Sequence, residues 1–384
     1  MTIKNTDEKC YWLTNYVESL FMKMWASITI ATSSFYMRNM LDVFSDRTGK
    51  HDTKFKMHDF GYRGVSSEES AGILGMSHLT SFYGSDNVLS INYIKECGVY
   101  SCDENYMPAF SVPASEHSIA TSYGKENEKE YLIHMLKTFP KGIVSVVADS
   151  YNVFDFCKMI VDDDEIYQMV MEREGTLVIR PDSGEPIRLI KECLDILCSR
   201  ECQLTERGFK LLPNNIRILQ SDGIDIHTTF DILYNLEKYS YASDNIVFGS
   251  GGGLLQKFNR DTNKFAIKCS SVIINGKQID VQKNPITDSG KKFKKGYLKL
   301  VKDDNGYRTL SSVDNKGEFE QAKDEMVVYY CVENYDKKPN MRKFGTTDFS
   351  FKFEDIRERI RNSQYNKNVY DMFVKEINYK DSEF

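Results

Sequence analysis

Four short apolar runs, each ending in a loop of Asp, Ser and Gly, constrain the fold of this chain more than any other feature. They read GIVSVVADS, GTLVIRPDSG, NIRILQSDG and NIVFGSGGG, and they span residues 142–150, 175–184, 215–223 and 245–253. Buried parallel strands read as continuous Val, Ile and Leu runs, and α/β proteins place their chemistry in the loops that leave the carboxyl ends of such strands. The runs therefore predict both a fold class and the position of a site.

Helical patterns follow the first three loops. After the second loop, Pro186 stands at an expected helix start, where its missing N–H costs nothing. Ile187, Ile190, Leu194 and Leu197 then fall on one helix face. Phe230, Leu233 and Leu236 do the same after the third loop. This alternation of strand and helix is typical of βαβ units and predicts an α/β fold.

The length of 384 residues exceeds the roughly 250 residues of a typical (β/α) barrel, which predicts one barrel and a smaller second domain. We expect the barrel over residues 46–260 and a mostly antiparallel β domain with C-terminal helices over 261–384. The turn dipeptides Asn275-Gly276 and Asn305-Gly306 indicate hairpins there, and EMVVYYCV (residues 325–332) indicates a further strand. Because this second domain consists of short hairpins, we expect residues 1–45, or another chain, to complete its core.

The N-terminal part of the chain mixes a helical pattern with short strand-like runs. The sequence from about Tyr11 to Met40 begins with a helical pattern and then reads as a strand in SITIATSS, residues 27–34. The run FKMHDFG, residues 55–61, reads as a short strand, and a helical pattern follows it.

Bulk composition excludes several classes of function. A net charge of -6 and a pI near 5.7 argue against a general electrostatic grip on nucleic acid or an anionic membrane. The polar start MTIKNTDEK is no secretory signal, and no apolar stretch approaches the about 18 residues of a membrane span. Nine cysteines, an odd number, indicate reduced thiols. We therefore expect a soluble, cytoplasmic protein.

The glycine-rich loop GSGGG, residues 249–253, closes the fourth run. Successive glycines let the backbone approach a ligand closely, and amides at a helix start favour a phosphate. The alternative is a plain flexible turn. The position after a strand and before a helix favours phosphate binding.

Acidic residues recur at the strand ends. RPDSG pairs Arg180 with Asp182, and Asp149 and Asp222 occupy equivalent positions. A guanidinium grips phosphate with two hydrogen bonds, and a carboxylate can hold a sugar hydroxyl or Mg²⁺. One isolated Asp would be explained by turn and N-cap preference. Three in one register, with an arginine among them, favour a binding site.

Two further loops carry residues suited to a ligand. HDFGYRGVSSEE supplies Phe60 and Arg63, which suit a flat heteroaromatic ring beside a phosphate. SVPASEHS carries Glu116 and His117, and a loop histidine is either a surface bystander or a general base or nucleophile. The lysines at 291, 292, 294 and 295 form a solvated edge or attract a nucleotide tail.

These motifs together resemble the nicotinamide phosphoribosyltransferases, which are type II phosphoribosyltransferases. The resemblance rests on HDFGYRGVSS, GSDNV, SVPASEHS, SVVADSY, VIRPDSGEP, LQSDGIDI and FGSGGGLLQK, which occur in the family's order. It implies a barrel of the type II kind and a reaction of NAD salvage. In that reaction nicotinamide displaces pyrophosphate from phosphoribosyl pyrophosphate to give nicotinamide mononucleotide, with Mg²⁺ bound.

The resemblance also implies roles for single residues. Phe60 corresponds to the residue that stacks on the nicotinamide ring, and Asp86 in GSDNV to the residue that accepts a hydrogen bond from the carboxamide. Arg63 and Arg180 correspond to the pair that contacts ligand phosphate.

The acids and glycines of the strand ends match sugar and phosphate contacts of the family. Asp182 and Asp222 correspond to sugar-contacting acids, and Asp149 to an acid near Mg²⁺ and pyrophosphate. Gly251 and Gly252 correspond to backbone donors for the 5'-phosphate. Further basic positions around the phosphates correspond to Arg260, Lys268, Lys283 and Lys291.

His117 corresponds to the histidine that ATP phosphorylates, so ATP is expected as a stimulating co-substrate. The expected catalytic residues are thus His117, Asp149, Asp182 and Arg180, and the expected Mg²⁺ ligands are Asp149 and Glu116. Ribosyl transfer builds positive charge on the sugar and negative charge on the leaving group, which carboxylates on one side and Mg²⁺ with arginine on the other stabilise. A phosphohistidine there would add about -1.5 to -2 charges.

Two departures from the family pattern leave alternatives open. Ser221 stands where the family has glycine, and its hydroxymethyl group either crowds the sugar pocket or is tolerated there. The family's segment ahead of YWLTN, which reaches the neighbouring subunit's site, is expected to come from elsewhere, such as a separate chain. A homodimer with shared active sites is expected. The alternatives are a nicotinate phosphoribosyltransferase, whose substrate carboxylate would meet the like charge of Asp86, and an incomplete or inactive homologue that needs a partner polypeptide.

Overall fold

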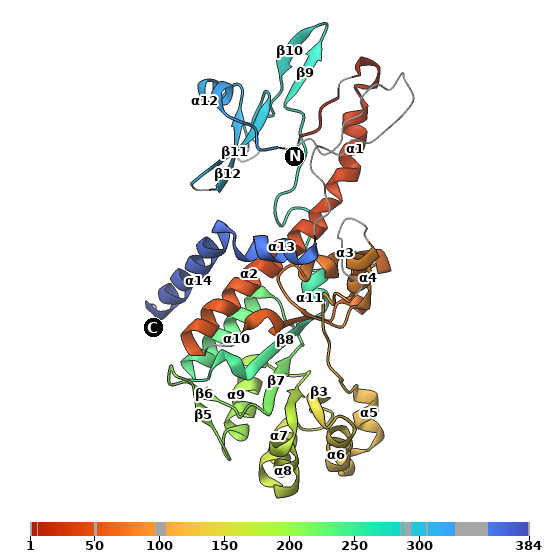
Figure 1. The fold of residues 1–384 in the computed structure, drawn as a ribbon, viewed down its shortest axis with the longest axis vertical. Coiled ribbons are helices and arrows are strands. Elements are labelled where there is room, and N and C mark those ends of the chain that lie inside the picture. Colours follow the sequence, from red (N-terminus) through yellow and green to blue (C-terminus); the bar gives the residue numbers. More distant parts are fainter. Residues whose placement is uncertain are drawn as a thin grey trace. The chain divides into compact units, whose positions relative to one another are not determined.

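The computed structural model describes residues 2–5, 7–49, 52–96, 105–284, 286–287, 293–304, 306–326 and 352–382 (Figure 1). The chain divides into two compact units. An α/β unit comprises residues 26–259 and 351–384, and a smaller unit comprises residues 1–25 and 260–350. These ranges differ from those expected from the sequence, because residues 26–45 and the C-terminal helices pack with the strands of the α/β unit.

The α/β unit contains a six-stranded, wholly parallel sheet with the strand order β2-β1-β8-β7-β4-β3. In chain order the strands are β1 Met57–Asp59, β2 Gly84–Ser85, β3 Lys141–Val147, β4 Glu174–Arg180, β7 Ile216–Gln220 and β8 Ile246–Ser250. β3, β4, β7 and β8 coincide with the four apolar runs to within one residue at their starts, so the α/β prediction is confirmed at the level of these strands. A separate antiparallel pair, β5 Gln203–Leu204 and β6 Lys210–Leu211, lies between β4 and β7 in the chain.

The extended segment 110–115 bridges the two edge strands of this sheet. At one end, the Phe110 N–H donates to the Tyr83 carbonyl beside β2 (2.8 Å), and at the other the Ser115 N–H donates to the Ser145 carbonyl of β3 (3.0 Å). Both bridges are parallel. Edge strands present unpaired backbone groups, and here one segment satisfies part of both edges.

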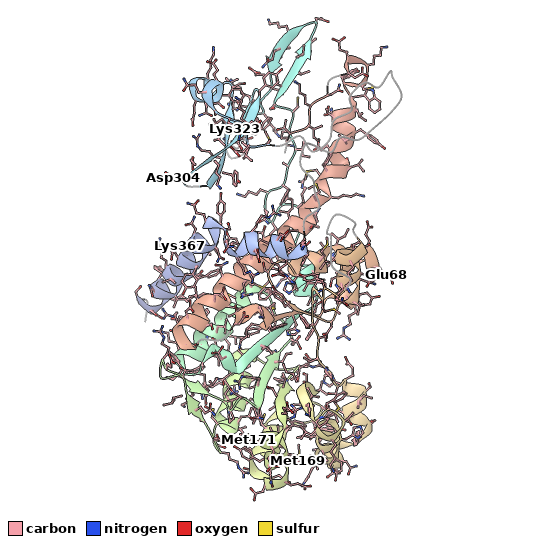
Figure 2. The ribbon with its side chains drawn as sticks, in the orientation of Figure 1. Glu68, Met169, Met171, Asp304, Lys323 and Lys367 are labelled. Carbon is pink, nitrogen blue, oxygen red and sulfur yellow. The ribbon has the colours of Figure 1, made fainter. Side chains whose placement is uncertain are left out.

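Helices surround the strands of the α/β unit. They are α2 Met24–Thr48, α3 Glu68–His78, α4 Val88–Glu96, α5 His117–Ser122, α6 Glu128–Thr138, α7 Val153–Asp162, α8 Asp164–Glu172, α9 Pro186–Leu197, α10 Ile226–Lys238, α11 Gly252–Leu255, α13 Phe353–Arg361 and α14 Gln364–Ser382. Figure 2 marks Glu68 in the first turn of α3, Met169 and Met171 on α8, and Lys367 on α14.

Helix α9 begins where the sequence predicts. Pro186 occupies its first position, and the Glu185 side chain caps it by accepting from the Ile187 and Arg188 backbone N–H groups. The residues predicted for its inner face, Ile190, Leu194 and Leu197 among them, are buried except Ile187, which is partly buried against the core.

Helix α10 also follows its prediction. Phe230, Leu233 and Leu236 are all buried. A capping box between Asp225 and Thr228 fixes the start of this helix directly after the loop that leaves β7.

The strand predicted for SITIATSS is wrong, because these residues belong to α2. Its buried residues Ile30, Met37, Leu41 and Phe44 recur at helical spacing and join the same hydrophobic core as the sheet. The β-branched residues of the short run favour a strand locally, but the apolar face of the whole helix outweighs this preference.

The C-terminal helices complete the α/β unit. Phe373 and Ile377 of α14 are buried in its main core, and the Phe373 ring lies 6.4 Å from that of Phe230 in α10. In α13, Arg357 is only 2% exposed and donates to the backbone carbonyls of Leu79, Phe82 and Pro108. A C-terminal guanidinium thus ties together backbone that lies on both sides of β2 in the chain.

The smaller unit is built from short elements. They are α1 Leu13–Met22, β9 Ser271–Ile274, β10 Lys277–Asp280, β11 Leu298–Asp303, β12 Gly306–Ser311 and α12 Lys316–Gln321. β9 pairs antiparallel with β10 and β11 with β12, which confirms the hairpin predictions. Asn275 and Gly276 both have positive φ, 50° and 73°, as a type I′ turn requires. The strand predicted over 325–332 falls almost wholly outside the described residues.

No helix among the described ranges has the length and apolar character needed to cross a membrane.

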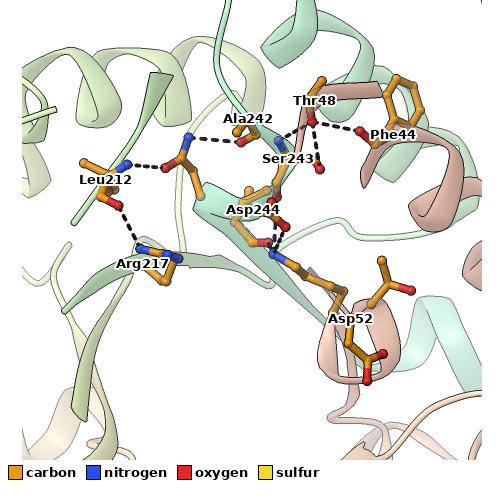
Figure 3. A network of polar contacts seen from close by, with 12 residues as sticks. Phe44, Thr48, Asp52, Leu212, Arg217, Ala242, Ser243 and Asp244 are labelled. Atoms are coloured by element: carbon orange, nitrogen blue, oxygen red, sulfur yellow. Dashed lines mark hydrogen bonds and ion pairs between the residues drawn. The ribbon is translucent and has the colours of Figure 1, made fainter. Parts of the chain in front are cut away.

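A buried polar network joins β1 to the segment that enters β8 (Figure 3). The Lys56 ammonium donates to the Ile246 carbonyl (3.1 Å) and lies 3.6 Å from Asp244, whose side chain is 1% exposed. Within the described ranges, neither oxygen of Asp244 has a hydrogen-bond donor. Burial lowers the pKa of Lys56 to about 8, although attraction to Asp244 partly opposes this effect. Lys56 therefore forms an ion pair with a buried carboxylate, which Arg217 also attracts from further away.

We predict that Lys56→Met destabilises the protein by about 3–5 kcal/mol, because the variant removes the cation that pairs with the buried Asp244 and leaves only the more distant Arg217. The double variant Lys56→Met/Asp244→Leu should recover most of the loss, since it removes both charges. Urea unfolding of the three proteins measures this. Lys141→Met is the control, because the Lys141 side chain is 77% exposed and its pair with Glu174 is worth about 1 kcal/mol or less. Equal losses in the single and double variants would contradict this account.

Candidate active site

The residues selected from the sequence lie at one edge of the sheet, because all six strands run parallel. They follow β1 (Phe60 and Arg63), β2 (Asp86), β3 (Asp149), β4 (Asp182, with Arg180 as the last strand residue), β7 (Asp222) and β8 (Gly251 and Gly252). Glu116 and His117 stand at the start of α5, directly after the bridging segment 110–115.

Asp149 is the centre of a hydrogen-bonded group at the ends of β3 and β4. Its Oδ1 lies 3.0 Å from His117 Nε2, and its Oδ2 accepts from the Ser183 hydroxyl at 2.7 Å. Burial would raise the pKa of Asp149, but hydrogen bonds from Ser183, His117 and the Asp182 backbone outweigh it and lower this pKa below its ordinary value. Asp149 is therefore an ionised carboxylate at neutral pH.

A second carboxylate is held in the same way one strand further along. The Ser221 hydroxyl, after β7, donates to Asp182 Oδ1 at 2.7 Å. Each of the two acids thus accepts a hydrogen bond from a serine that follows the next strand in the sheet.

Arg180 is anchored at one end of its guanidinium. Its Nη2 donates to the Ser115 carbonyl at 3.2 Å, so the arginine fixes the bridging segment to the end of β4. Its Nε is buried and has no hydrogen-bond acceptor in the part of the chain that the structure describes. A buried cationic donor without an acceptor is costly, and an anionic ligand would remove that cost.

The loops after β1 and β8 pack tightly against each other. The Phe60 N–H donates to the Ser250 carbonyl at 2.9 Å. The Phe60 ring covers Gly249 so closely that a Cβ there would lie 2.1 Å from it, so this position requires glycine. A Cβ on Gly253 would meet the Ile224 carbonyl at 2.5 Å, which brings the loop after β7 into the same contact. A Cβ on Gly252 would have no heavy atom within 4 Å, so space lies open beside its backbone.

Asp86 joins the loop after β2 to this group. The Ser111 hydroxyl donates to its Oδ1, and its backbone N–H donates to the Asp59 carbonyl at 3.0 Å. Together with the contacts above, this completes a ring of neighbouring loops around the carboxyl edge of the sheet. The acidic, glycine and arginine loops selected from the sequence therefore lie at one edge of the sheet.

Asp59 is a residue that the sequence analysis missed. It is fully buried at the end of β1, where its carboxylate accepts from the Gly61 N–H (2.7 Å) and the Asn87 side chain (3.0 Å). It thereby holds the turn that carries Phe60 and the residue after Asp86. Burial raises the pKa of Asp59 to about 6. A polar residue that ends an apolar run was the signal that identified Asp149, and it applies to Asp59 as well.

Other serines in the ring were also missed. Ser111, Ser115 and Ser183 make the contacts described above, but a single serine in a loop gives no sequence signal that separates it from an ordinary turn residue.

Three of the four basic residues predicted around the phosphates belong to the smaller unit and not to the α/β unit. Arg260, Lys268 and Lys283 belong to the smaller unit, and Lys291 lies outside the described residues. Their predicted roles stay predictions, as do those of the ring residues.

Comparisons with known proteins agree with these motifs. The model of the nicotinate phosphoribosyltransferase family matches residues 55–336. A nicotinamide phosphoribosyltransferase from Xanthomonas campestris pv. campestris is 39% identical over 309 residues, 79% of this chain and 64% of that protein. One from Acinetobacter baylyi is 32% identical over 350 residues, 83% and 68% of the two chains. The chain thus spans about two thirds of the length of these relatives. A structure of a putative nicotinate phosphoribosyltransferase from Saccharomyces cerevisiae aligns at 14% identity with a TM-score of 0.41, over 61% and 50% of the two chains.

We predict that the stability difference between wild type and Asp59→Asn depends on pH. Because the pKa of Asp59 is raised from 3.8 to about 6 on folding, the folded state holds the proton more tightly, and this contribution is lost as pH rises from about 4 to 6. Relative to the non-titrating variant, the wild type should lose up to about 1.4 kcal/mol per pH unit in that window.

Urea unfolding of both proteins between pH 4 and pH 7 measures this difference. Asp162→Asn, which removes an exposed carboxylate from α7, controls for the change in net charge. A difference that stays constant across the window would contradict the raised pKa.

Proposed function

The chain belongs to the nicotinate phosphoribosyltransferase family, and on this premise we propose that it is a pentosyltransferase of NAD salvage. In the proposed reaction nicotinamide displaces pyrophosphate from phosphoribosyl pyrophosphate and gives nicotinamide mononucleotide. The observation that carries the proposal is the ring of mutually contacting loops, which brings acids, an arginine, glycines and an aromatic ring to one edge of a parallel sheet. The relatives named nicotinamide phosphoribosyltransferase support the choice of base.

We further propose that this sheet is a (β/α) barrel of the type II phosphoribosyltransferase kind. The bridges that segment 110–115 makes to β2 and to β3 support closure, because these are the two edge strands of the six-stranded sheet. The ring of loops would then be the mouth of the barrel, where barrel enzymes carry their active sites.

The proposed chemistry is mainly electrostatic. As the ribosyl–pyrophosphate bond breaks, positive charge develops on the sugar, and the carboxylates of Asp182 and Asp222 stabilise it. The lowered pKa of Asp149 supports its proposed place beside Mg²⁺, since that carboxylate stays ionised at the pH of the reaction. Arg63 and Arg180 bind ligand phosphate, and the buried, unpaired Nε of Arg180 supports this assignment. The open space beside Gly252 supports backbone donation to the 5'-phosphate by Gly251 and Gly252.

Mg²⁺ is the proposed cofactor, with Asp149 and Glu116 as its protein ligands. No cluster of three or more His, Cys, Asp or Glu side chains suited to a metal occurs among the described residues. Proteins hold Mg²⁺ with one or two carboxylates together with substrate phosphates and water. When bound, it would neutralise charge on the departing pyrophosphate.

For the base we propose stacking on Phe60 and a hydrogen bond from the carboxamide to Asp86. The Asp86 carboxylate, with one oxygen held by Ser111, favours an amide N–H donor over a second carboxylate. Nicotinate is the second candidate substrate, because the family model carries its name.

His117 is the residue that we propose for phosphorylation by ATP. A neutral imidazole that donates from Nε2 to Asp149 presents its lone pair on Nδ1. Its side chain is 41% exposed, which leaves it accessible to a nucleotide.

We propose a homodimer with shared active sites. The described part of the smaller unit exposes large apolar side chains along α1, where Trp12, Tyr16 and Leu20 recur every four residues with 53%, 68% and 60% of their surface exposed. A continuous apolar helix face of this kind suits a protein surface as partner.

The first experiment incubates the purified chain with nicotinamide, phosphoribosyl pyrophosphate and Mg²⁺, and measures nicotinamide mononucleotide by chromatography. We expect product, and we expect Asp86→Asn to lower the preference for nicotinamide over nicotinate, as a ratio of kcat/KM values, by about tenfold, because the variant loses the charge that repels a carboxylate. Asp162→Asn should keep the wild-type ratio. An unchanged ratio in Asp86→Asn would exclude the assigned role, and product from nicotinate alone would favour the second candidate.

We predict that His117→Ala abolishes stimulation by ATP. Without the imidazole no phosphohistidine can form, so the ratio of rates with and without ATP should fall to about one. His134→Ala, which changes an exposed histidine of α6, should keep the wild-type ratio. Stimulation that persists in His117→Ala would rule out this site of phosphorylation.

A further inference from the structure

One contact in the ring has no role in the proposed chemistry as set out above. The Ser221 hydroxyl donates to Asp182 Oδ1 at 2.7 Å, and the two residues are 39 positions apart in the chain. Ser221 lies after β7 and Asp182 after β4, so the hydrogen bond joins the ends of two adjacent strands. Ser221 and Asp182 are both only partly buried, which leaves the pair within reach of a ligand.

We propose that Ser221 is a positioning residue for the phosphoribosyl donor, which it serves by fixing the carboxylate of Asp182. This inference rests on the proposed function, in which Asp182 accepts a hydrogen bond from a ribose hydroxyl. With Oδ1 held by Ser221, Oδ2 is the oxygen that receives the sugar.

The hydrogen bond from Ser221 restricts the rotation of the Asp182 carboxylate. The χ2 torsion of an aspartate is broad, so an unrestrained Asp182 would have to be ordered when the sugar binds. A hydroxyl that donates to a carboxylate makes a charge-assisted hydrogen bond. Ser221 therefore orders Asp182 before the ligand binds. Less conformational entropy is then lost on binding, and the affinity for the ligand is higher.

The effect of Ser221 extends to the next strand end. The hydroxyl of Ser183, the residue next to Asp182, donates to Asp149 Oδ2 at 2.7 Å. Two hydrogen bonds thus connect three strand ends: Ser221 to Asp182 joins β7 to β4, and Ser183 to Asp149 joins β4 to β3. Loss of the Ser221 hydroxyl would release Asp182, the first of these two ordered carboxylates.

The test compares Ser221→Ala, Ser221→Gly and Ser221→Thr with the wild type. Calorimetric titration with phosphoribosyl pyrophosphate and Mg²⁺ gives Kd without turnover, and initial rates at saturating nicotinamide give kcat and KM for the donor. We expect Ala and Gly to raise Kd and KM for the donor by about tenfold, the loss of one hydrogen bond to a charged group. Thr, which keeps the hydroxyl, should restore both to within about twofold of wild type. KM for nicotinamide should stay unchanged in all three variants.

A double-mutant cycle separates positioning from general loss of structure. In an Asp182→Asn background, Ser221→Ala should have little further effect on Kd, because the charged acceptor is gone. Ser199→Ala is the matched control, since the Ser199 hydroxyl donates to the Ile196 carbonyl at the end of α9 and lies outside the ring. Thermal unfolding of each variant identifies any that fails to fold, and Ser221→Thr then carries the comparison.

Wild-type affinity in Ser221→Ala and Ser221→Gly, or an undiminished effect of Ser221→Ala in the Asp182→Asn background, would overturn the inference alone. A wild-type protein that neither binds phosphoribosyl pyrophosphate nor forms nicotinamide mononucleotide would overturn the proposed function, and the inference with it.

Discussion

The parallel hydrogen-bond ladder of the six strands is the constraint on which the rest of the structure depends. Because every strand points the same way, residues that end six separate segments of the chain meet at one edge. Segment 110–115 then bridges β2 and β3, so that Ser111 can reach Asp86 and Ser115 can hold Arg180. An antiparallel strand at any of these positions would move its loop to the opposite edge and break the ring.

The electrostatics of the ring differ from one carboxylate to the next. Asp59 is buried, and its pKa is raised because burial outweighs its two hydrogen bonds. Asp149 is less buried and receives hydrogen bonds from His117, Ser183 and the Asp182 backbone, so its pKa is lowered. Asp59 thus stabilises a turn, whereas Asp149 presents a fixed negative charge. In a protein with a net charge of -6, an anionic ligand depends on local donors such as Arg180 and the glycine amides.

The sequence predicted the central strands and their helices because these elements carry strong local signals. β3, β4, β7 and β8 are apolar runs, and α9 and α10 have clear caps and apolar faces. It misassigned SITIATSS because the β-branched residues of a short window hide the longer periodicity of α2. It missed Asp59 although this residue ends an apolar run, as Asp149 does. It missed Ser111, Ser115 and Ser183 because their roles come from contacts between residues far apart in the chain, such as the 34 positions between Asp149 and Ser183. Side-chain contacts across strand ends cannot be read from local patterns.

Under the proposed function, the loops at the carboxyl edge of the sheet form one binding site for an activated ribose. Hydrogen–deuterium exchange with and without phosphoribosyl pyrophosphate and Mg²⁺ tests it most directly. We predict that the ligand slows backbone amide exchange together in five loops of the ring, which are residues 59–64, 148–151, 180–184, 220–225 and 249–254. Slower exchange confined to other regions, or to only one of these loops, would contradict the claim.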